Sequence, residues 1–356
     1  MKVLFIGGTG IISAAVSRQA VAKGLDLYLL NRGLRGVNPP GSRTLTADTR
    51  QPEDVKAALA GLQFDVVVNW IAYTPDDIER DLALFQGRVK QYIFISSASV
   101  YQKPPTHYLI TEATPLHNPY WDYSRNKIAC EERLMRAYAE GGFPVTIVRP
   151  SQTYDLNFPV AIGGGSYYTL ADRLKKGLPI IVHGDGTSLW VLTHAEDFGR
   201  GFLGLVGNWK AIGNAFHITS DEVLTWEQIY QFIAEALGVE ANIVHIPSDF
   251  IARIEPELAG TLLGDKTWST VFDNSKIKRF VPRFKAVIPF RDGIRRTLAW
   301  FETDERRQRV DETAKKRIEH ILKAYVVNSA EGRVVRTPGR REALRGRDPG
   351  GSRSDP

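Results

Sequence analysis

Three polar residues, Ser97, Tyr123 and Lys127, have the types and the spacing needed to exchange a proton with an alcohol. Tyr123 and Lys127 are four residues apart, so on a helix their side chains share one face. A tyrosine titrates near pH ~10, but a neighbouring ammonium group stabilises its phenolate. Tyr123 could then act as the base, while Ser97 donates a hydrogen bond to the developing carbonyl oxygen. The pattern predicts a catalytic set; the alternative is a surface pair on a helix.

The stretch Gly7-Gly8-Thr9-Gly10 predicts a phosphate-binding turn, because it lies between a short apolar strand and a helix that begins at Ile11. Gly7 permits the tight turn, and Gly10 lets the backbone approach a pyrophosphate. The helix N-terminus adds unpaired N–H groups and the positive end of a dipole. Ser13 stands where the usual motif has a third glycine. The alternative is a tight turn that binds no ligand.

Arg32 follows the second expected strand, residues 25–30, at the place where dinucleotide folds bind the adenosine ribose. An acid there binds the 2′-hydroxyl of NAD, whereas an arginine can hold the 2′-phosphate of NADP. Arg32 is present and the acid is absent, so we expect NADP or NAD as cofactor, with NADP favoured. The alternative is a solvated loop arginine. Asp48, after a short third strand, could accept a hydrogen bond from the adenine amino group.

Strands alternate with helices from the first residue to about residue 150, which indicates an α/β fold with a doubly wound, parallel, Rossmann-type sheet. Such sheets bind ligands beyond the carboxyl ends of their strands. Several of the residues discussed above follow strands, so we expect them to meet at one edge. The predicted cofactor-binding residues are Gly7, Thr9, Gly10, Ile11, Ile12, Asn31, Arg32, Asp48, Ala72, Tyr123, Lys127 and Pro150.

The regular alternation loosens beyond residue 158. We assign residues 1–158 to a dinucleotide-binding domain, with strands around 180–219 returning to it. Residues 159–325 form a smaller C-terminal α+β substrate domain, in which one helix is expected over 193–206. The Arg/Gly/Pro/Ser-rich stretch 326–356 has no hydrophobic periodicity and is predicted to be a disordered basic tail. Much of the formal charge of +6 lies in that tail, so the charge says little about the ligand of the folded part.

Composition excludes several classes of protein. No apolar run reaches the ~18 residues that cross a bilayer, and the chain begins with a strand, where a signal peptide would have its charged region. The single cysteine, Cys130, excludes an internal disulfide, and the seven histidines show no metal-ligand spacing. We therefore expect a cytoplasmic protein without a metal site or a membrane partner. Nucleic acid is not the expected partner, and a homodimer stays open.

The sequence resembles the short-chain dehydrogenase/reductase superfamily, and within it the extended, NAD-dependent epimerase/dehydratase branch, over residues 1–305. The resemblance implies an N-terminal NAD(P) domain, a C-terminal substrate domain, and the catalytic roles given above for Ser97, Tyr123 and Lys127. It rests on Gly7-Gly-Thr-Gly10, Asp48, Ser96-Ser97-Ala-Ser-Val-Tyr101, Tyr123-x-x-x-Lys127, Val148-Arg149-Pro150, Gly184-Asp-Gly186, His194-Ala-Glu-Asp197 and Phe216-His-Ile-Thr219.

Two departures from that family bear on the substrate. Nucleotide-sugar epimerases usually carry an arginine after the Gly-Asp-Gly turn, and the matching position here is Trp190. Sugar 4,6-dehydratases place an Asp-Glu pair after the catalytic hydroxyl residue, where this chain has Ala98 and Ser99. We expect oxidation, reduction or epimerisation of a secondary alcohol on an uncharged or singly charged sugar, glycoside or polyol. The predicted substrate residues are Ser99, Arg149 and Trp190. Because a similar branch includes chloroplast RNA-binding relatives, a retired enzyme that binds RNA is the alternative.

Overall fold

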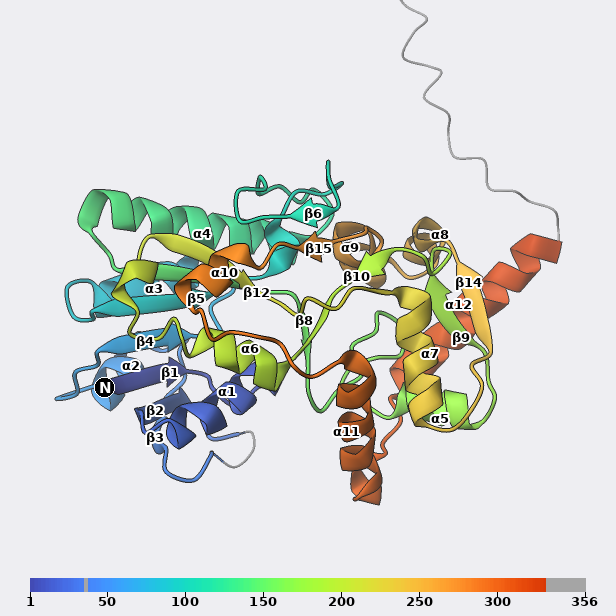
Figure 1. Cartoon of the computed structure of the whole chain (residues 1–356), viewed down its shortest axis with the longest axis horizontal. Helices are drawn as coiled ribbons and strands as arrows, with labels where there is room; N and C mark the ends of the chain where they lie inside the picture. Colours follow the sequence, from blue (N-terminus) through green and yellow to red (C-terminus); the bar gives the residue numbers. More distant parts are fainter. Residues whose placement is uncertain (35–37, 331–356) are drawn as a thin grey trace, which may run out of the picture.

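The fold is centred on a seven-stranded β-sheet, which is parallel, as the sequence predicted. The structure is a computed structural model that describes residues 1–34 and 38–330 of the 356-residue chain. The sheet contains β1 (Lys2–Ile6), β2 (Asp26–Asn31), β3 (Arg43–Thr46), β4 (Val66–Asn69), β5 (Gln91–Ile95), β7 (Val145–Pro150) and β12 (Asn214–Ile218). Their order is β12-β7-β5-β4-β1-β2-β3 (Figure 1). The direction of winding reverses between β1 and β4, which is the switch point where such sheets bind ligands.

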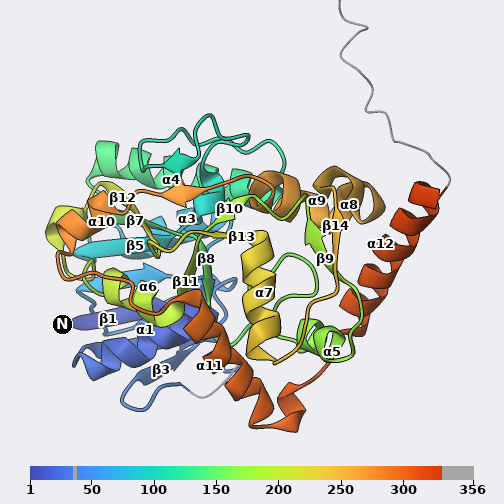
Figure 2. The same ribbon diagram turned by 45° about the vertical axis from the view of Figure 1, so that its right-hand side comes forward.

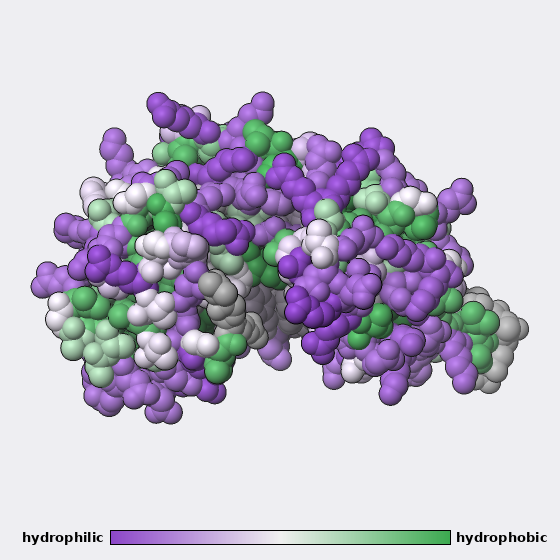
Figure 3. Space-filling view, turned by 90° about the horizontal axis from the view of Figure 1, so that it is seen from below, coloured by the Kyte–Doolittle hydropathy of each residue, from purple (hydrophilic) through white to green (hydrophobic). Residues whose placement is uncertain are grey.

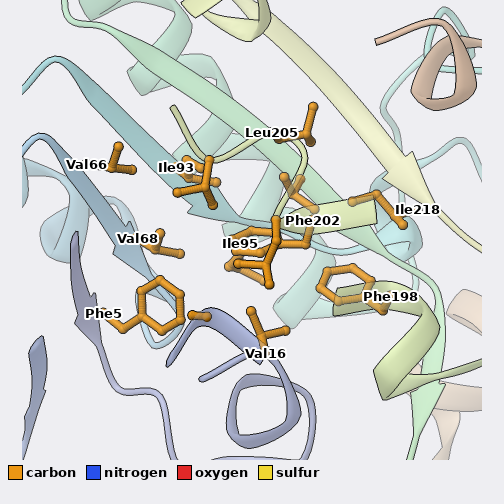
Figure 4. Close-up of a cluster of buried hydrophobic side chains, with 14 of the residues drawn as sticks. Phe5, Val16, Val66, Val68, Ile93, Ile95, Phe198, Phe202, Leu205 and Ile218 are labelled. Atoms are coloured by element: carbon orange, nitrogen blue, oxygen red, sulfur yellow. The ribbon is translucent and has the colours of Figure 1, made fainter. Parts of the chain in front are cut away.

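Helices cover both faces of this sheet, because successive strand residues point to opposite sides. They are α1 (Ile11–Ala22), α2 (Pro52–Ala58), α3 (Pro75–Phe85), α4 (Asp122–Gly141), α6 (Ala195–Phe202) and α10 (Ser275–Phe280). On one face, Phe5 and Val68 pack with Val16 of α1 and Phe198 of α6 (Figure 4). On the other face, Leu4 packs in a cluster with residues of α2, α3 and α4. Burial on both faces explains why the central strands are continuous apolar runs.

A second, smaller lobe lies beside the sheet (Figure 2). It contains α5 (Thr169–Lys175), β9 (Ile180–His183), α7 (Trp226–Ala236), β14 (Ile243–Ile246), α8 (Ser248–Ile254), α9 (Ala259–Thr261), α11 (Phe290–Glu302) and α12 (Glu312–Ala330). β9 and β14 pair in parallel. Its core includes Trp190, Trp226, Tyr230 and Phe301. A further hydrophobic cluster includes Ile318 of α12.

Short strands and single turns complete the fold between the two lobes. β8 pairs with β11 in parallel, β10 pairs with β13 antiparallel, and β6 pairs with β15 in parallel. The bounds are β6 (Leu109–Ile110), β8 (Gln152–Tyr154), β10 (Leu189–Trp190), β11 (Leu192–His194), β13 (Leu224–Thr225) and β15 (Val271–Phe272). The turns are η1 (Ala98–Val100), η2 (Trp209–Ala211), η3 (Pro256–Leu258), η4 (Leu262–Lys266) and η5 (Glu305–Arg307).

The structure differs from the expected organisation in three places. Of the strands expected around 180–219, only β12 joins the large sheet; β9 pairs with β14 and β11 pairs with β8. The helix expected over 193–206 is shorter, because its first residues belong to β11. α12 continues to Ala330, so residues 326–330, which were assigned to the tail, are helical. The rest of the predicted tail, 331–356, lies outside the described residues.

The face seen in Figure 3 is mostly hydrophilic, and its hydrophobic residues form separate small groups, so this face carries no large apolar patch. Within residues 1–34 and 38–330, no helix combines the length and the hydropathy of a membrane span. In the same part of the chain, no group of three or more His, Cys, Asp or Glu side chains could hold a metal ion.

Candidate active site

A cleft with a volume of about 1040 Å³ opens at the carboxyl ends of the sheet strands β1 to β5 and β7. It lies at the switch point of the winding. The structure brings most of the predicted residues together there, although they come from separate turns of the chain. The predicted residues that line the cleft are Gly7, Thr9, Gly10, Ile11, Ile12, Asn31, Arg32, Asp48, Ser97, Tyr123, Lys127 and Pro150.

The glycine turn has the shape that a pyrophosphate requires. Gly8 has a φ of +95°, and a Cβ there would stand 2.7 Å from Cδ2 of Leu29. The backbone N–H of Gly10 donates to Oγ of Ser13 at 2.9 Å, so the serine that replaces the third glycine braces the turn. The first N–H groups of α1 have no partner within the helix, and Ile11 and Ile12 line the cleft. This turn fits the diphosphate of a dinucleotide.

The part of the cleft that follows β2 and β3 carries two arginines and one acid, Arg32, Arg50 and Asp48. Oδ1 of Asp48 accepts a hydrogen bond from Nε of Arg50 at 3.0 Å, and this pairing holds the pKa of Asp48 well below its usual range. Arg32 has no ion-pair partner among the described residues. Arg32 and Asp48 also line a smaller adjoining cavity of about 540 Å³. Sequence reasoning missed Arg50, although its spacing of two residues from Asp48 was a usable signal.

Lys127 is fixed by the backbone. Its side chain is 1% exposed, and Nζ donates to the carbonyl oxygens of Ala72 at 2.7 Å and Ile95 at 2.8 Å. An ammonium group has three protons, so one donor remains for the cleft. Nζ lies 5.8 Å from the ring centroid of Tyr123. Burial lowers the pKa of Lys127 to about 8, so the ammonium form still predominates at neutral pH.

Tyr123 lies beside the serine that was predicted to assist it. Burial raises the pKa of Tyr123 to about 12, and a hydrogen bond with Ser97 acts in the opposite direction. Oγ of Ser97 is 2.9 Å from Oγ of Ser99, which in turn accepts from Ser124 at 2.7 Å. Ser99 does not line the cleft; it positions Ser97 through the hydrogen bond between the two hydroxyl groups. The ring of Trp121 packs at 4.9 Å from the ring of Tyr123.

A buried polar network supports the wall of the cleft after β4, and sequence reasoning missed it. Nδ2 of Asn69 donates to Asp81 at 2.5 Å, and Oδ1 of Asn69 accepts from the backbone N–H of Ile71 at 2.8 Å. The hydroxyl of Tyr92 also donates to Asp81. Ile71 and Tyr73 line the cleft. The network therefore sets the position of this loop, and the isolated Asn and Asp gave no pattern that could have revealed it.

None of the three predicted substrate residues lines the cleft: Ser99 lies behind Ser97, and Arg149 and Trp190 are buried elsewhere. Arg149 is 5% exposed, and its Nη2 contacts the carboxylate of Glu131 at 2.6 Å in a buried ion pair. Trp190 is 3% exposed, and its ring packs at 5.2 Å from the ring of Trp226 in the core of the second lobe. Ala72 is also buried and contributes its carbonyl to Lys127. The cleft residues that sequence reasoning missed on the second-lobe side are Gln152, Asn157 and Ser166.

Comparison with protein families gives a match over most of the sheet domain. The family model described as "NAD dependent epimerase/dehydratase family" matches residues 3–218. That span includes the glycine turn and all three predicted catalytic residues. It ends with the last strand of the large sheet.

Individual proteins are similar over longer stretches. The chain is 28% identical over 290 residues to 2′-dehydrokanamycin reductase of Streptomyces kanamyceticus, covering 80% of each chain. It is 30% identical over 270 residues to the chloroplast stem-loop binding protein of 41 kDa b of Arabidopsis thaliana, covering 70% of this chain and 67% of that protein. The UDP-glucose 4-epimerase of Thermus thermophilus, solved with NAD, superposes with a TM-score of 0.67 at 19% identity. That match covers 85% of this chain and 99% of the epimerase, and it shows a shared fold.

Proposed function

Because this chain belongs to the NAD dependent epimerase/dehydratase family of oxidoreductases, we propose that it interconverts a secondary alcohol and a ketone on a sugar or sugar-like substrate. The observation that carries the proposal is the meeting of Ser97, Tyr123 and Lys127 with the glycine turn in one cleft. These residues come from separate segments of the chain. A turn that bound no ligand, or a surface Tyr–Lys pair, would not require this convergence.

The side chains have complementary roles in this reaction. A bound nicotinamide cofactor supplies or removes hydride at the substrate carbon. Tyr123 holds the proton that the substrate oxygen loses or gains, and Ser97 donates a hydrogen bond to that oxygen. Lys127 is held by two carbonyl groups, so its charge stays near the phenol and favours the phenolate. Its remaining N–H is available to the cofactor ribose.

We infer NADP as the preferred cofactor within this NAD-dependent family. Arg32 stands at the end of β2, where the ribose 2′-position is bound, and no acid neighbours it in Asn31-Arg32-Gly33. The nearby carboxylate of Asp48 is already paired with Arg50, which reduces its repulsion of a 2′-phosphate. A guanidinium group suits a phosphate because it donates two parallel hydrogen bonds.

Reduction or oxidation is favoured over epimerisation, since the relative at 28% identity is named a reductase of 2′-dehydrokanamycin. The alternative of an RNA-binding protein without turnover is not favoured, although the stem-loop binding relative keeps it testable. The three residues proposed to be catalytic share one cleft, which a pure binding protein would not need.

The test is turnover of NADPH or NADP⁺ with a panel of keto-sugars, glycosides and polyols. Tyr123→Phe should lower kcat at least about a hundredfold, because general acid–base catalysis contributes that much. It should leave the Kd for the cofactor unchanged. Tyr138→Phe is the matched control, since Tyr138 lies on the same helix, is exposed and does not line the cleft. Full turnover in Tyr123→Phe, or stem-loop RNA binding with no turnover in the wild type, would overturn the proposal.

A further inference from the structure

Lys127 is a buried cation that no carboxylate in the described part of the chain balances. Its side chain is 1% exposed, and two of its three protons go to the carbonyl oxygens of Ala72 and Ile95. Within residues 1–34 and 38–330, no Asp or Glu side chain lies within ion-pair distance of its Nζ. Burial of an ammonium group is costly unless other groups replace its lost hydration. The two carbonyl oxygens supply part of that replacement, and the rest must come from the other groups around Nζ.

The groups that act on this charge come mainly from α3 and α4, two helices that lie side by side on one face of the sheet (Figure 1). Each of the two acids among these groups is already paired with an arginine. Burial raises the pKa of the Cys130 thiol to about 12, so the thiol carries no charge near neutral pH. The titratable groups that face Lys127 are Tyr73, Asp77, Tyr123, Cys130 and Glu131.

Aromatic rings flank the ammonium group of Lys127. Its Nζ lies 4.8 Å from the ring centroid of Tyr73 and 4.8 Å from that of Phe94. Phe94 is fully buried in β5, so its ring covers the side toward the sheet. Tyr73 is 48% exposed and lines the cleft, so its ring covers the side toward the cleft. The face of an aromatic ring is negative and attracts a cation at such distances.

The ring of Tyr73 also contacts the proposed base. Its centroid lies 6.4 Å from that of the Tyr123 ring, and the two ring planes are inclined by 48°. Nζ of Lys127 lies 5.8 Å from the centroid of the Tyr123 ring, farther than from that of Tyr73. One side chain therefore contacts both the cation and the phenol whose ionisation the cation is proposed to favour.

The backbone around Tyr73 is fixed by hydrogen bonds. The N–H of Tyr73 donates to Oδ2 of Asp77 at 2.8 Å, and the same oxygen accepts from the N–H of Thr74 at 2.9 Å in the capping box of α3. The carbonyl oxygen of the preceding residue, Ala72, accepts from Lys127. Adjacent residues of one loop thus supply both a carbonyl oxygen and a ring to the same ammonium group.

We propose that Tyr73 is a positioning residue, whose ring keeps the charged ammonium group of Lys127 in place beside the phenol of Tyr123. The inference rests on the proposed function of the cleft. Tyr123 acts as a base only while a positive charge stabilises its phenolate. That stabilisation disappears once Lys127 loses its proton. A ring that favours the charged form of Lys127 therefore extends the reaction to higher pH.

The pKa of Lys127 can be measured by NMR of protein that contains lysine labelled with ¹³C at Cε, where its signal is the one absent from Lys127→Met. Tyr73→Leu should lower this pKa by about 0.5 to 1.5 pH units, the effect of losing one buried cation–π contact. Leucine still covers the ammonium group with apolar atoms, so the loss of the ring face decides the direction. Tyr73→Phe keeps the ring and should restore the wild-type pKa.

Tyr108→Leu is the matched control, because Tyr108 is 55% exposed, similar to Tyr73, and does not line the cleft. It should change neither the pKa of Lys127 nor turnover. Tyr73→Met also lacks a ring and should repeat the effect of Tyr73→Leu, which keeps the test available if the leucine variant does not fold. An unchanged pKa of Lys127 in the ring-free variants, with a lower melting temperature as the only effect, would assign Tyr73 to folding and overturn the proposal.

The pH profile of turnover connects this effect to the reaction. For oxidation of a substrate alcohol by NADP⁺, the ratio of wild-type kcat to that of Tyr73→Leu should be near one at pH 6. It should reach about three- to thirtyfold at pH 9, because the charged fraction of Lys127 falls at lower pH in the variant. Tyr73→Phe should follow the wild-type profile. A ratio that is the same at every pH would contradict the proposed role.

The two measurements distinguish this proposal from the proposed function. A lowered pKa of Lys127 in Tyr73→Leu, in a protein whose wild type turns over none of the panel, would uphold the contact and refute the reaction. Turnover of a sugar by the wild type, with the pKa of Lys127 unaffected by Tyr73→Leu, would uphold the reaction and refute the role of Tyr73.

Discussion

At the residue scale, burial in the wall of the cleft disfavours the charged forms of both Tyr123 and Lys127. Burial displaces the pKa of Tyr123 upward to about 12 and that of Lys127 downward to about 8. Both displacements favour the uncharged form, so the pair stays short of forming an ion pair on its own. A positive charge brought near the phenol would favour the phenolate. The geometry thus keeps Tyr123 protonated until a ligand completes the site.

Arg32 is expected to set the cofactor preference. Arg32→Ala should raise the Kd for NADP⁺ about ten- to hundredfold, because it removes a charge-assisted contact to the 2′-phosphate, and leave the Kd for NAD⁺ nearly unchanged. Fluorescence titration of both cofactors measures this. Arg43→Ala serves as the control, since Arg43 is exposed, pairs with Asp26 and does not line the cleft. Equal affinities of the wild type for the two cofactors would contradict the NADP assignment.

Asp81 is expected to make stability depend on pH. Burial raises its pKa to about 6, from 3.8. Between those values the folded protein holds a proton that the unfolded chain has lost, so this group lowers stability as pH rises from about 4 to 6. The cost is fully present at pH 7 and is about 2–3 kcal/mol.

Asp81→Asn should therefore raise the melting temperature at pH 7, and the gain should shrink as the pH falls toward 4. Asparagine keeps an oxygen that can accept from Asn69 and Tyr92, so the wall of the cleft should hold. Scanning calorimetry at pH 7 and pH 4.5 measures the difference. Asp76→Asn, at an exposed position of the same helix, should show no such pH-dependent gain. A gain of equal size at both pH values would show that burial of the Asp81 charge is not its cause.

At the element scale, the position of each turn relative to its strand decides whether a residue reaches the cleft. β7 ends with Arg149 and Pro150, whose side chains point to opposite sides. Pro150 faces the cleft, and Arg149 faces Glu131 of α4. The glycine turn depends similarly on geometry, because only a residue without a Cβ fits between β1 and Leu29 at Gly8.

Gly8→Ala should show how strictly this turn is specified. The positive φ and the approach to Leu29 together should cost about 3 kcal/mol or more. Gly24→Ala is the matched control, because Gly24 also has a positive φ, of +76°, but a Cβ there would meet no atom within 4 Å. It should cost about 1 kcal/mol. Urea unfolding compares the two. Equal losses would show that the close approach to Leu29 carries no energetic weight.

Local patterns predicted the elements that local interactions define. The spacing of Tyr123 and Lys127 suggested that both lie on one helix, and α4 carries both; it ends at Gly141, where Gly142 supplies a left-handed cap with φ of +64°. Pairing with distant segments left no such signal. Thr193 and His194 were expected to open a helix, yet they pair with β8, and the side chain of His194 caps the shorter helix α6. The periodicity of a segment cannot show which distant strand it meets.

The same limit applies to the site. Residues that follow strands of a parallel sheet could be placed in one cleft, because topology alone brings strand ends together. The side of β7 on which Arg149 lies, and the depth of Trp190 in the second lobe, depend on packing between elements.

At the scale of the whole molecule, several contacts fasten the second lobe and its neighbouring segments to the sheet domain. Arg18 of α1 pairs with Asp155 at 3.3 Å, and the hydroxyl of Thr297, in α11 of the second lobe, donates to the carbonyl of the same Asp155. Asn157 and Ser166 share the cleft with the glycine turn. Residues of both regions thus enclose one site, and its volume depends on their relative placement.

The C-terminal helix is expected to matter for stability, and the residues after it are not. Deleting residues 331–356 should leave the melting temperature and turnover nearly unchanged, because their composition cannot build a hydrophobic core. Ending the chain at Asp311 removes α12, whose Ile318 and Ile321 are buried. Two such side chains are worth about 3–6 kcal/mol, so this truncation should melt at a much lower temperature. A large loss from the shorter deletion would show that the basic segment binds the body.

Nδ2 of Asn118 donates to the carbonyl of Ser99 at 2.8 Å and to the carbonyl of Gly264, in η4, at 2.7 Å. This double hydrogen bond has a consequence for recombination among relatives. Enzymes built from a cofactor domain and a substrate domain are natural candidates for exchange of whole domains to obtain new specificities. Here one side-chain amide donates a hydrogen bond to a carbonyl of the cofactor domain, that of Ser99, and to the carbonyl of Gly264. An incoming substrate domain must therefore place a carbonyl of its own where Gly264 has one. A chimera that fails to do so would lose the support of the loop behind Ser97 together with the old specificity. In this protein, the boundary between the modules runs through the catalytic centre.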